Sequence, residues 1–226
     1  MKVTVIMPVY NERTTLEEIV ERVLAVPLQI ELIIIDDAST DGSEEILSRL
    51  TDSRIRIERH PQNRGKGAAI RTAIPHATGD VVLIQDADLE YDPGQIPEII
   101  APIARGVADV VYGSRFLGGP HRVHLFWHYV ANRTLTFLSN LLNNLNLTDM
   151  ETCYKCVRRE LIQSIPLRSE RFGIEPELTA KLARRGARFY EVPISYFGRD
   201  YAEGKKIGWK DGVAALGAIV RYRFVD

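Results

Sequence analysis

Residues Asp80–Pro93 read DVVLIQDADLEYDP, and this stretch decides the predicted fold of the chain. It begins with an apolar run, Val81–Ile84, and then places acids at alternate positions, Asp86, Asp88 and Glu90. A short apolar run without polar alternation is typical of a strand that is buried on both faces. Open α/β sheets bind ligands at the carboxyl ends of such strands, so the acids are predicted to lie in a binding site.

The alternate spacing of these acids suits a divalent cation. Carboxylate oxygens are hard ligands that Mg²⁺ or Mn²⁺ prefers, and such cations commonly accompany phosphate-bearing substrates. The alternative interpretation is a solvated acidic turn after a strand, and a D-x-D pattern by itself does not exclude it. The loops that follow the other strands decide between these two interpretations.

Length and composition narrow the class of protein. The chain has 226 residues, of which 45% are hydrophobic and 26% charged, and its net charge is −1. One domain with a full core is expected, and the composition argues against disorder and against a nucleic-acid-binding surface. No stretch approaches the roughly eighteen apolar residues of a membrane-spanning helix, and no signal-peptide pattern follows Met1. We therefore expect a cytoplasmic protein that could bind at the cytoplasmic face of a membrane.

Strand and helix patterns alternate in the first half. Strands are predicted at 2–7, 31–35, 54–58 and 81–84, and helices at 16–24, 43–50 and 68–77. Thr14 or Thr15 is expected to cap the first helix, with Glu17 or Glu18 completing a capping box. Alternation of this kind implies a parallel sheet with right-handed crossovers. Three distinctive loops then share its carboxyl edge: PVYNE at 8–12, DDASTDGS at 36–43 and QDADLEYDP at 85–93.

The second half is less regular. Its patterns predict strands at 109–112, 151–157 and 188–196 and helices at 125–145, 176–185 and 209–224, with the strand at 151–157 on a mixed sheet. No repeat and no low-complexity linker separates the halves. The chain is therefore interpreted as one domain, 1–226.

Gly65-Lys66-Gly67 invites a phosphate-loop interpretation, but its surroundings depart from that motif. No glycine lies five residues before the Gly-Lys pair, and no G-x-G-x-x-G follows the first strand. A tight turn that leads into a helix, made possible by glycine, is favoured over direct contact with phosphate.

Two further sets of metal-ligand residue types have simple explanations. His121, His124 and His128 would align on one side of a helix and could form a metal face, but the aromatic residues between them favour a packing or membrane-touching segment. Cys153 and Cys156 lack the second half of a zinc site, so two packed thiols are favoured over a redox or metal role.

Several charged residues would be surface groups if they stood alone. Asp36-Asp37 at a strand end is either a turn device or a ligand for a ribose hydroxyl or base edge, and Glu12 presents a similar choice. Cations are expected where a diphosphate is held, and four follow predicted sheet elements: Arg115, Arg199, Lys205 and Lys206.

Six motifs, in this order, resemble those of the dolichol-phosphate mannose synthase (polyprenyl-phosphate glycosyltransferase) group of inverting family 2 glycosyltransferases. They are PVYNE (8–12), DDASTDGS (36–43), QDADLEYDP (85–93), GSRF (113–116), DMETCYK (149–155) and GRDYAEGKKIGWKDG (198–212). The resemblance covers nearly the whole chain. It implies a GT-A (nucleotide-diphospho-sugar transferase) fold, in which a nucleotide-sugar-binding half, about 1–112, joins an acceptor-binding half, about 113–226, without a linker.

The resemblance also implies roles for individual residues. The nucleotide sugar would be bound by Pro8, Tyr10, Glu12, Ile35, Asp37, Asp86, Ala87, Asp88, Arg115, Arg199 and Lys205, with Ala87 contributing its backbone. The metal would be bound by Asp86, Asp88 and Glu90, and catalysis would depend on Asp86, Asp88, Arg199 and Lys205. Members of the group commonly have Gln where this chain has Glu90, a departure that bears on the sugar donor more than on the reaction.

The expected reaction is a metal-dependent, inverting displacement that moves mannose or glucose from a nucleoside diphosphate to a polyprenyl or dolichyl phosphate. A phosphate acceptor is already ionised and needs no strong base, whereas an alcohol would need a carboxylate such as Asp88 or Glu90.

Two helices have alternative interpretations. The 125–145 helix and the last helix, with Trp209, Tyr222 and Phe224, either rest on a bilayer or pack in the core.

Three alternatives remain at the level of sequence. One is a family 2 enzyme with a non-lipid hydroxyl acceptor. A sugar-phosphate nucleotidyltransferase would need a Gly-rich loop after the first strand, where this chain has PVYNERTT. A non-catalytic nucleotide-sugar-binding protein would be expected to have lost a metal carboxylate, and all three are present.

Overall fold

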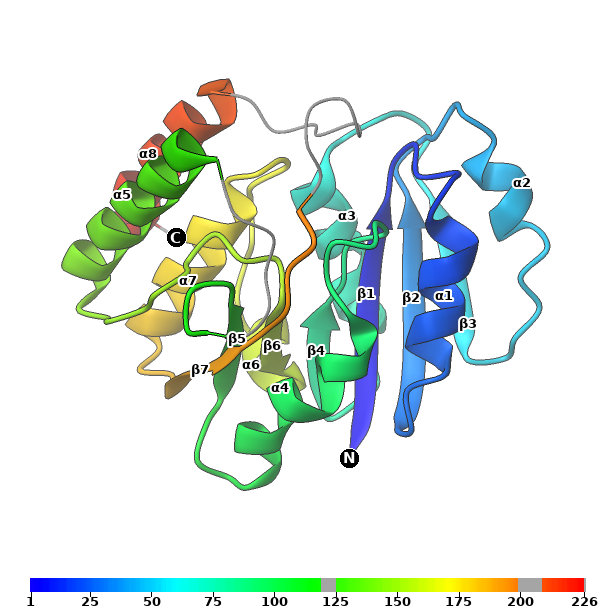
Figure 1. Ribbon diagram of the computed structural model, residues 1–226, viewed down its shortest axis with the longest axis horizontal. Helices are drawn as coiled ribbons and strands as arrows, with labels where there is room; N and C mark the ends of the chain where they lie inside the picture. The colour runs from blue at the N-terminus through cyan, green and yellow to red at the C-terminus, as the bar shows by residue number, and fades with distance from the viewer. Residues whose placement is uncertain (119–124, 199–208, 226) are drawn as a thin grey trace.

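The structure, a computed structural model, describes residues 1–118, 125–198 and 209–225. Its centre is one sheet with the strand order β3-β2-β1-β4-β6-β5-β7 (Figure 1). The strands are β1 (Lys2–Val9), β2 (Gln29–Asp36), β3 (Ile55–Arg59), β4 (Val81–Ile84), β5 (Val110–Ser114), β6 (Lys155–Arg158) and β7 (Phe189–Pro193). Only β6 is antiparallel to its neighbours within this sheet. The predicted α/β class with a mostly parallel sheet is confirmed.

Helices cover both faces of the sheet. In Figure 1, α1 (Leu16–Leu24) and α4 (Ile96–Ala104) lie in front of it, and α3 (Lys66–Ala73) and α6 (Arg159–Gln163) lie behind it. The short α2 (Ser43–Leu47) packs against α1. Three helices pack on one another at the opposite end: α5 (Phe126–Asn143), α7 (Ile174–Arg184) and α8 (Trp209–Phe224).

The stretch that decides the fold is buried as its sequence predicts. All four residues of β4 are buried, and Val81, Val82 and Leu83 have no exposed surface. β1 pairs with β4 on one side and β2 on the other, so that Val5 lies level with both Leu83 and Leu32. Burial on both faces explains why β4 shows no polar alternation.

Several predicted boundaries differ from those of the structure. The helix predicted at 68–77 begins at Lys66 and gives way at Ile74 to a 3-10 turn, Ile74–His76. The strand predicted at 151–157 is shortened to Lys155–Arg158. Helix α4 was not predicted, because Pro97 and Pro102 obscure its pattern. Pro97 lies in the first turn, where its missing N–H costs no intrahelical bond.

The predicted capping box at α1 is wrong. Thr15 does occupy the cap position, but its side chain makes no capping hydrogen bond to the helix. Its hydroxyl instead donates to the backbone carbonyl of Ala87, 2.9 Å away in the loop after β4. The threonine therefore joins two loops at the carboxyl edge of the sheet.

The strand order places a topological switch point at β1 and β4. From β1 the chain proceeds outward through β2 and β3, then returns and adds β4 on the other side of β1. The loops after β1 and β4 therefore lie next to each other at the carboxyl edge, where doubly wound α/β proteins bind their ligands.

Close packing explains the glycines that flank Lys66. Gly65 has φ of +96°, and a Cβ there would lie 2.5 Å from the carbonyl oxygen of Glu170. A Cβ on Gly67 would lie 2.5 Å from the carbonyl oxygen of Ser169. The amide of Ala68 donates to the Glu170 carbonyl at 3.0 Å. These contacts support the predicted tight turn into a helix, with the first turn of α3 packed against the chain before α7.

Candidate active site

The loop after β1 is held to the loop after β2 by hydrogen bonds. The amide of Asn11 donates to Ser39 Oγ at 3.1 Å, and the Asn11 side chain accepts from the amide of Thr40 at 2.8 Å. The amide of Glu12 donates to Ser43 Oγ at 3.2 Å. Asn11 has φ of +55°, a left-handed conformation that asparagine tolerates better than most residues. The two loops therefore form one unit at the switch point.

The residues predicted to surround the nucleotide differ in accessibility. Tyr10 is 39% exposed, and Pro8 and Glu12 are partly exposed. Ile35 lies level with Pro8 in the neighbouring strand, and its side chain is completely buried. Tyr10 and Glu12 therefore reach the surface, whereas a contact by Ile35 stays a prediction that its buried side chain does not favour.

Asp37 organises the loop that leads into α3. One carboxylate oxygen lies 2.7 Å from His60 Nδ1 and accepts from the amide of Arg64 at 2.9 Å, and the other accepts from the amide of Gly65 at 2.6 Å. His60 Nε2 lies 2.9 Å from Thr72 Oγ1. Asp37 thus serves as a turn device, one of its two predicted interpretations, and nucleotide binding by it stays a prediction.

The loop after β4 is fixed from several directions. The carbonyl of Ala87 accepts from Thr15, and the Asp88 carboxylate accepts from the amide of Glu90 at 3.1 Å. The buried side chain of Gln85 accepts a 2.5 Å hydrogen bond from the Tyr154 hydroxyl. Asp88 is 8% exposed, and this local bonding holds its carboxylate in a defined place.

Asp86 forms an ion pair that the sequence did not predict. Lys66 Nζ lies 2.9 Å from one Asp86 oxygen and 3.1 Å from the other, and it also lies 3.2 Å from Glu175 Oε1. Burial would lower the pKa of Lys66, but the carboxylates of Asp86 above all and of Glu175 raise it well above its usual value. Lys66 is therefore a fixed positive charge between Asp86 and Glu175.

Glu90 belongs to a second chain of contacts. The Tyr196 hydroxyl donates to Glu90 Oε2 at 2.8 Å, and the Arg115 guanidinium lies 5.1 Å from the centre of the Tyr196 ring. Arg115 donates to both oxygens of Asp149, at 2.7 and 2.8 Å. Burial would raise the pKa of the Asp149 carboxyl, but the facing guanidinium lowers it. Arg115 is thus oriented toward the Glu90 side of the loop.

The donor set at Asp86 and Asp88 is compatible with a cation that a substrate helps to bind. Within 1–118, 125–198 and 209–225, no three His, Cys, Asp or Glu side chains are grouped so that they could hold a metal ion. Mg²⁺ is usually bound by one or two carboxylates together with substrate phosphates, so two acids suffice at such a site. The carboxylates of Asp86 and Asp88 fit that role, whereas Glu90 as a third ligand stays a prediction.

Some predicted site residues are not placed by the structure. Arg199, Lys205, Lys206, His121 and His124 lie outside the described residues. Cys153 and Cys156 are buried free thiols, as predicted, and burial raises the pKa of both.

The sequence did not predict that four residues take part in the site: Thr15, Lys66, Asp149 and Tyr196. Lys66 was considered only as part of a glycine-rich turn, although its place between two tightly packed glycines was the available signal. Asp149 and Tyr196 lie near or within quoted motifs, but no local pattern shows that they approach Arg115 from different elements.

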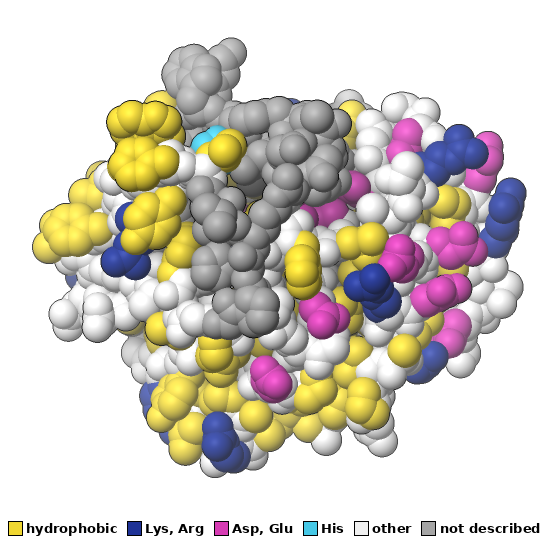
Figure 2. Space-filling model, in the orientation of Figure 1, with side chains coloured by type: hydrophobic (Ala, Val, Ile, Leu, Met, Phe, Trp, Pro, Cys, Tyr) yellow, Lys and Arg dark blue, Asp and Glu magenta, His cyan; other side chains and the backbone are white. Residues whose placement is uncertain are grey.

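Helices α5 and α8 lie side by side and expose many apolar side chains (Figures 1 and 2). Trp127 is 75% exposed and Phe224 71% exposed. We call this surface the apolar face, and it consists of Leu125, Phe126, Trp127, Tyr129, Phe137, Leu141, Val213, Leu216, Val220 and Phe224. None of the helices that the structure describes has both the length and the apolar character needed to cross a bilayer.

Comparison with known proteins gives consistent matches. Residues 4–165 match the family model described as "Glycosyl transferase family 2". A dolichol-phosphate mannosyltransferase from Pyrococcus furiosus is 28% identical over 214 residues, which are 92% of this chain and 60% of that protein. An undecaprenyl-phosphate 4-deoxy-4-formamido-L-arabinose transferase from Salmonella paratyphi A is 30% identical over 211 residues, 90% of this chain and 62% of that one. The chain thus spans about 60% of the length of these relatives.

Solved structures share the fold. Glucosyl-3-phosphoglycerate synthase from Mycobacterium tuberculosis, in complex with Mn²⁺, UDP and phosphoglyceric acid, has a TM-score of 0.75 and 20% identity, over 100% of this chain and 79% of that chain. The same enzyme with Mn²⁺, UDP-glucose and phosphoglyceric acid gives a TM-score of 0.77 at 19% identity, over 100% and 80% of the two chains. The predicted GT-A fold is confirmed by this likeness.

Proposed function

The chain belongs to glycosyl transferase family 2, and we propose that it transfers a sugar from a nucleoside diphosphate to a polyprenyl phosphate with inversion at the anomeric carbon. Mannose or glucose is the favoured sugar. The observation that carries this proposal is the pair Asp86 and Asp88 at the carboxyl end of β4, beside the switch point. Support for the acceptor comes from relatives named for dolichol phosphate and undecaprenyl phosphate.

The donor would lie across the joined loops at the switch point. Tyr10 contributes an exposed group and Glu12 a partly exposed one from the loop after β1, and Ala87 lies between the two acids of the loop after β4. Arg115 would face the diphosphate or the acceptor phosphate. Arg199 and Lys205 retain their predicted role as cations that stabilise the leaving diphosphate.

Asp86 and Asp88 would hold a divalent cation, Mg²⁺ or Mn²⁺, together with the donor diphosphate. When bound, the cation neutralises the charge that grows on the leaving group. In the described structure, Lys66 occupies both oxygens of Asp86. Donor and metal binding would therefore require Lys66 to share or release that carboxylate.

The reaction itself needs little acid–base chemistry. An oxygen of the acceptor phosphate attacks C1 of the sugar, the C1–O bond to the diphosphate breaks, and its electron pair leaves with the nucleoside diphosphate. The acceptor oxygen is already ionised, so no proton must be removed. The site residues would chiefly hold donor and acceptor in line.

A direct test is thermal unfolding with GDP, UDP, GDP-mannose and UDP-glucose, each with and without Mn²⁺. The matching nucleotide with Mn²⁺, at a hundred times its Kd, should stabilise the fold by about 2.7 kcal/mol, or roughly 5–10 °C. Addition of a polyprenyl phosphate should then release nucleoside diphosphate. The absence of any nucleotide-dependent shift would contradict the proposal, and binding without release would contradict transfer to a polyprenyl phosphate.

The apolar face would bring the site to a lipid acceptor. Arg133 on α5 and Arg221 on α8 are exposed cations that suit anionic headgroups. Full burial of an aromatic side chain contributes about 1.5–3 kcal/mol, so a few such residues suffice for reversible binding.

Replacement of Trp127 and Phe224 by Ser should lower the affinity for anionic liposomes, measured by cosedimentation, tenfold or more. Tyr190→Ser is a matched control, because Tyr190 is 45% exposed on β7, away from the apolar face. Equal binding by both variants would count against membrane contact through α5 and α8.

A further inference from the structure

Unpaired polar atoms occur on Glu175, which contacts Lys66, and on Glu151, which lies close enough to Glu175 for their charges to interact. Six buried side-chain atoms lack a hydrogen-bond partner among the described residues, and three of them are Glu151 Oε1, Thr152 Oγ1 and Glu175 Oε2. The first two come from the chain before β6 and the third from the first turn of α7. Buried polar atoms are nearly always paired in folded proteins, so a group of unpaired oxygens calls for an explanation.

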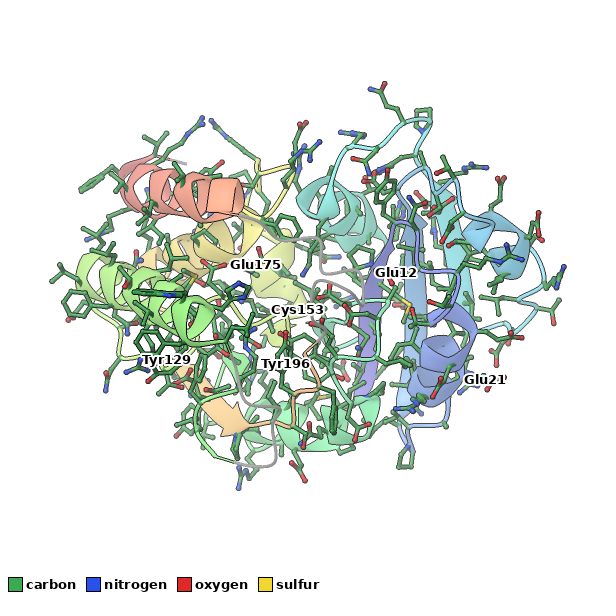
Figure 3. The ribbon with its side chains drawn as sticks, turned by 45° about the horizontal axis from the view of Figure 1, so that its top comes forward. Glu12, Glu21, Tyr129, Cys153, Glu175 and Tyr196 are labelled. Carbon is green, nitrogen blue, oxygen red and sulfur yellow. The ribbon has the colours of Figure 1, made fainter. Side chains whose placement is uncertain are left out.

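Glu175 connects these residues to the candidate active site. Glu175 is 6% exposed, and its other oxygen, Oε1, lies 3.2 Å from Lys66 Nζ, which also bonds Asp86. In Figure 3, Glu175 and Cys153 lie in the middle of the molecule with Glu12 and Tyr196, between the peripheral Tyr129 and Glu21. One lysine therefore separates Glu175 from the acid that is proposed to bind the metal and diphosphate.

The nearby Lys155 does not donate a hydrogen bond to the unpaired oxygens of Glu151 and Glu175. Lys155 Nζ donates to the carbonyls of Met150 and Thr152, and it lies 4.5 Å from the centre of the Tyr112 ring. Burial, and secondly the charge of Glu175, raises the pKa of Glu151 to about 8. Burial therefore favours the protonated carboxyl of Glu151, which can donate one hydrogen bond and accept others.

A neighbouring glutamate shows that a carboxylate in the first turn of α7 can have all its oxygens paired. Glu177 is completely buried, yet its two oxygens accept from the amides of Arg168 and Ser169, at 2.7 and 2.6 Å. Glu177 also forms an ion pair with Lys181, whose Nζ lies 2.7 Å from Glu177 Oε1. Leaving a buried polar atom unpaired costs about 1–3 kcal/mol. Glu177 avoids that cost, whereas Glu151 and Glu175 do not.

We propose that Glu175 and Glu151, with the Thr152 hydroxyl, bind the hydroxyl groups of the sugar that is transferred and select a neutral sugar over an acidic one. This inference rests on the proposed function, because that function places the sugar beside Asp86. Sugar hydroxyls would donate to the unpaired oxygens, and Lys66 would offer a donor of its own. The carboxylate of a hexuronate would instead meet the negative charge of Glu175 at short range, which is unfavourable in a buried site.

The test compares affinity for a nucleoside diphosphate with affinity for its sugar derivative, in the presence of Mn²⁺. UDP, UDP-glucose and UDP-glucuronate serve if the wild type binds UDP; GDP, GDP-mannose and GDP-mannuronate serve if it binds GDP. Glu175→Gln should weaken binding of the neutral sugar nucleotide about tenfold and leave binding of the diphosphate unchanged. Glu151→Gln should act in the same direction. The wild type should bind the uronate at least tenfold more weakly than the neutral sugar nucleotide, and Glu175→Gln should narrow that difference.

Glu177→Gln is the matched control, since it changes a buried glutamate two residues away on the same helix. It should lower stability and leave the ratio of the two affinities unchanged. The inference is overturned if Glu175→Gln leaves that ratio at its wild-type value, or if it weakens diphosphate and sugar nucleotide equally. Failure of the wild type to bind any nucleotide would instead overturn the proposed function, and this inference with it.

Discussion

Asp88→Ala should reduce sugar transfer at least about a thousandfold at saturating Mn²⁺. Asp88 is almost buried and its carboxylate is held by the amide of Glu90, so no other side chain takes its place without rebuilding the loop. Loss of the charge stabilisation that a bound metal gives a leaving group is worth several kcal/mol. The measurement is release of nucleoside diphosphate in the presence of a polyprenyl phosphate.

Asp92→Ala provides the control for this loop. Asp92 is an acid four residues further on, and its carboxylate accepts from the amide of Gly94 at 2.9 Å to cap a 3-10 turn, Pro93–Gln95. Its loss should cost about 1 kcal/mol of stability and leave turnover close to that of the wild type. Turnover by Asp88→Ala at the level of Asp92→Ala would refute the role given to Asp88.

Asp149→Ala should lower the free energy of unfolding by about 3–5 kcal/mol. The change leaves the Arg115 guanidinium, which is only 12% exposed, without the carboxylate that it bonds through two nitrogens. An unpaired buried charge is expensive because its hydration is lost without compensation. Arg115 should also lose its orientation beside Tyr196, so donor binding should weaken in the same variant. Urea unfolding measures the first effect.

Asp109 is the control for Asp149, because it also pairs with arginine but at the surface. It bonds Arg158 and Arg188, at 3.0 and 2.8 Å, but those arginine side chains are 39% and 53% exposed. Exposed pairs contribute about 1 kcal/mol or less each, so Asp109→Ala should destabilise much less than Asp149→Ala. Equal losses would mean that burial does not set the strength of the Arg115–Asp149 pair. A double variant, Arg115→Met with Asp149→Leu, should recover much of the stability, because it removes both buried charges.

The first half of the fold could be predicted because its strands carry their own signal. Each residue of β4 is buried on one face or the other, so the run from Val81 to Ile84 is apolar throughout and ends where the acids begin. The same argument placed β1 and β2 and brought the loops after them to one edge. Helix α4 escaped prediction, since Pro97 and Pro102 resemble breaks in a helical pattern.

The roles of Lys66 and Glu175 could not be predicted in this way. They lie 109 positions apart and approach each other only because the chain before α7 packs against Gly65 and Gly67. No periodicity reports such a contact, because it depends on how two elements meet and not on the conformation of either. The placement of Cys153 beside Asp86 likewise follows from the insertion of β6 between β4 and β5.

By itself, the sequence determined the alternation of strands and helices, the buried character of β4 and the presence of Asp86 and Asp88 at its carboxyl end. These features are local, since the spacing of apolar and acidic residues along one segment is enough to specify them. Only the tertiary structure decided that Lys66 neutralises Asp86, that Asp149 orients Arg115, and that Glu151 and Glu175 keep unpaired oxygens behind the site. The reason is physical: the charge, pairing and burial of these groups depend on neighbours from distant segments, which the fold alone brings together.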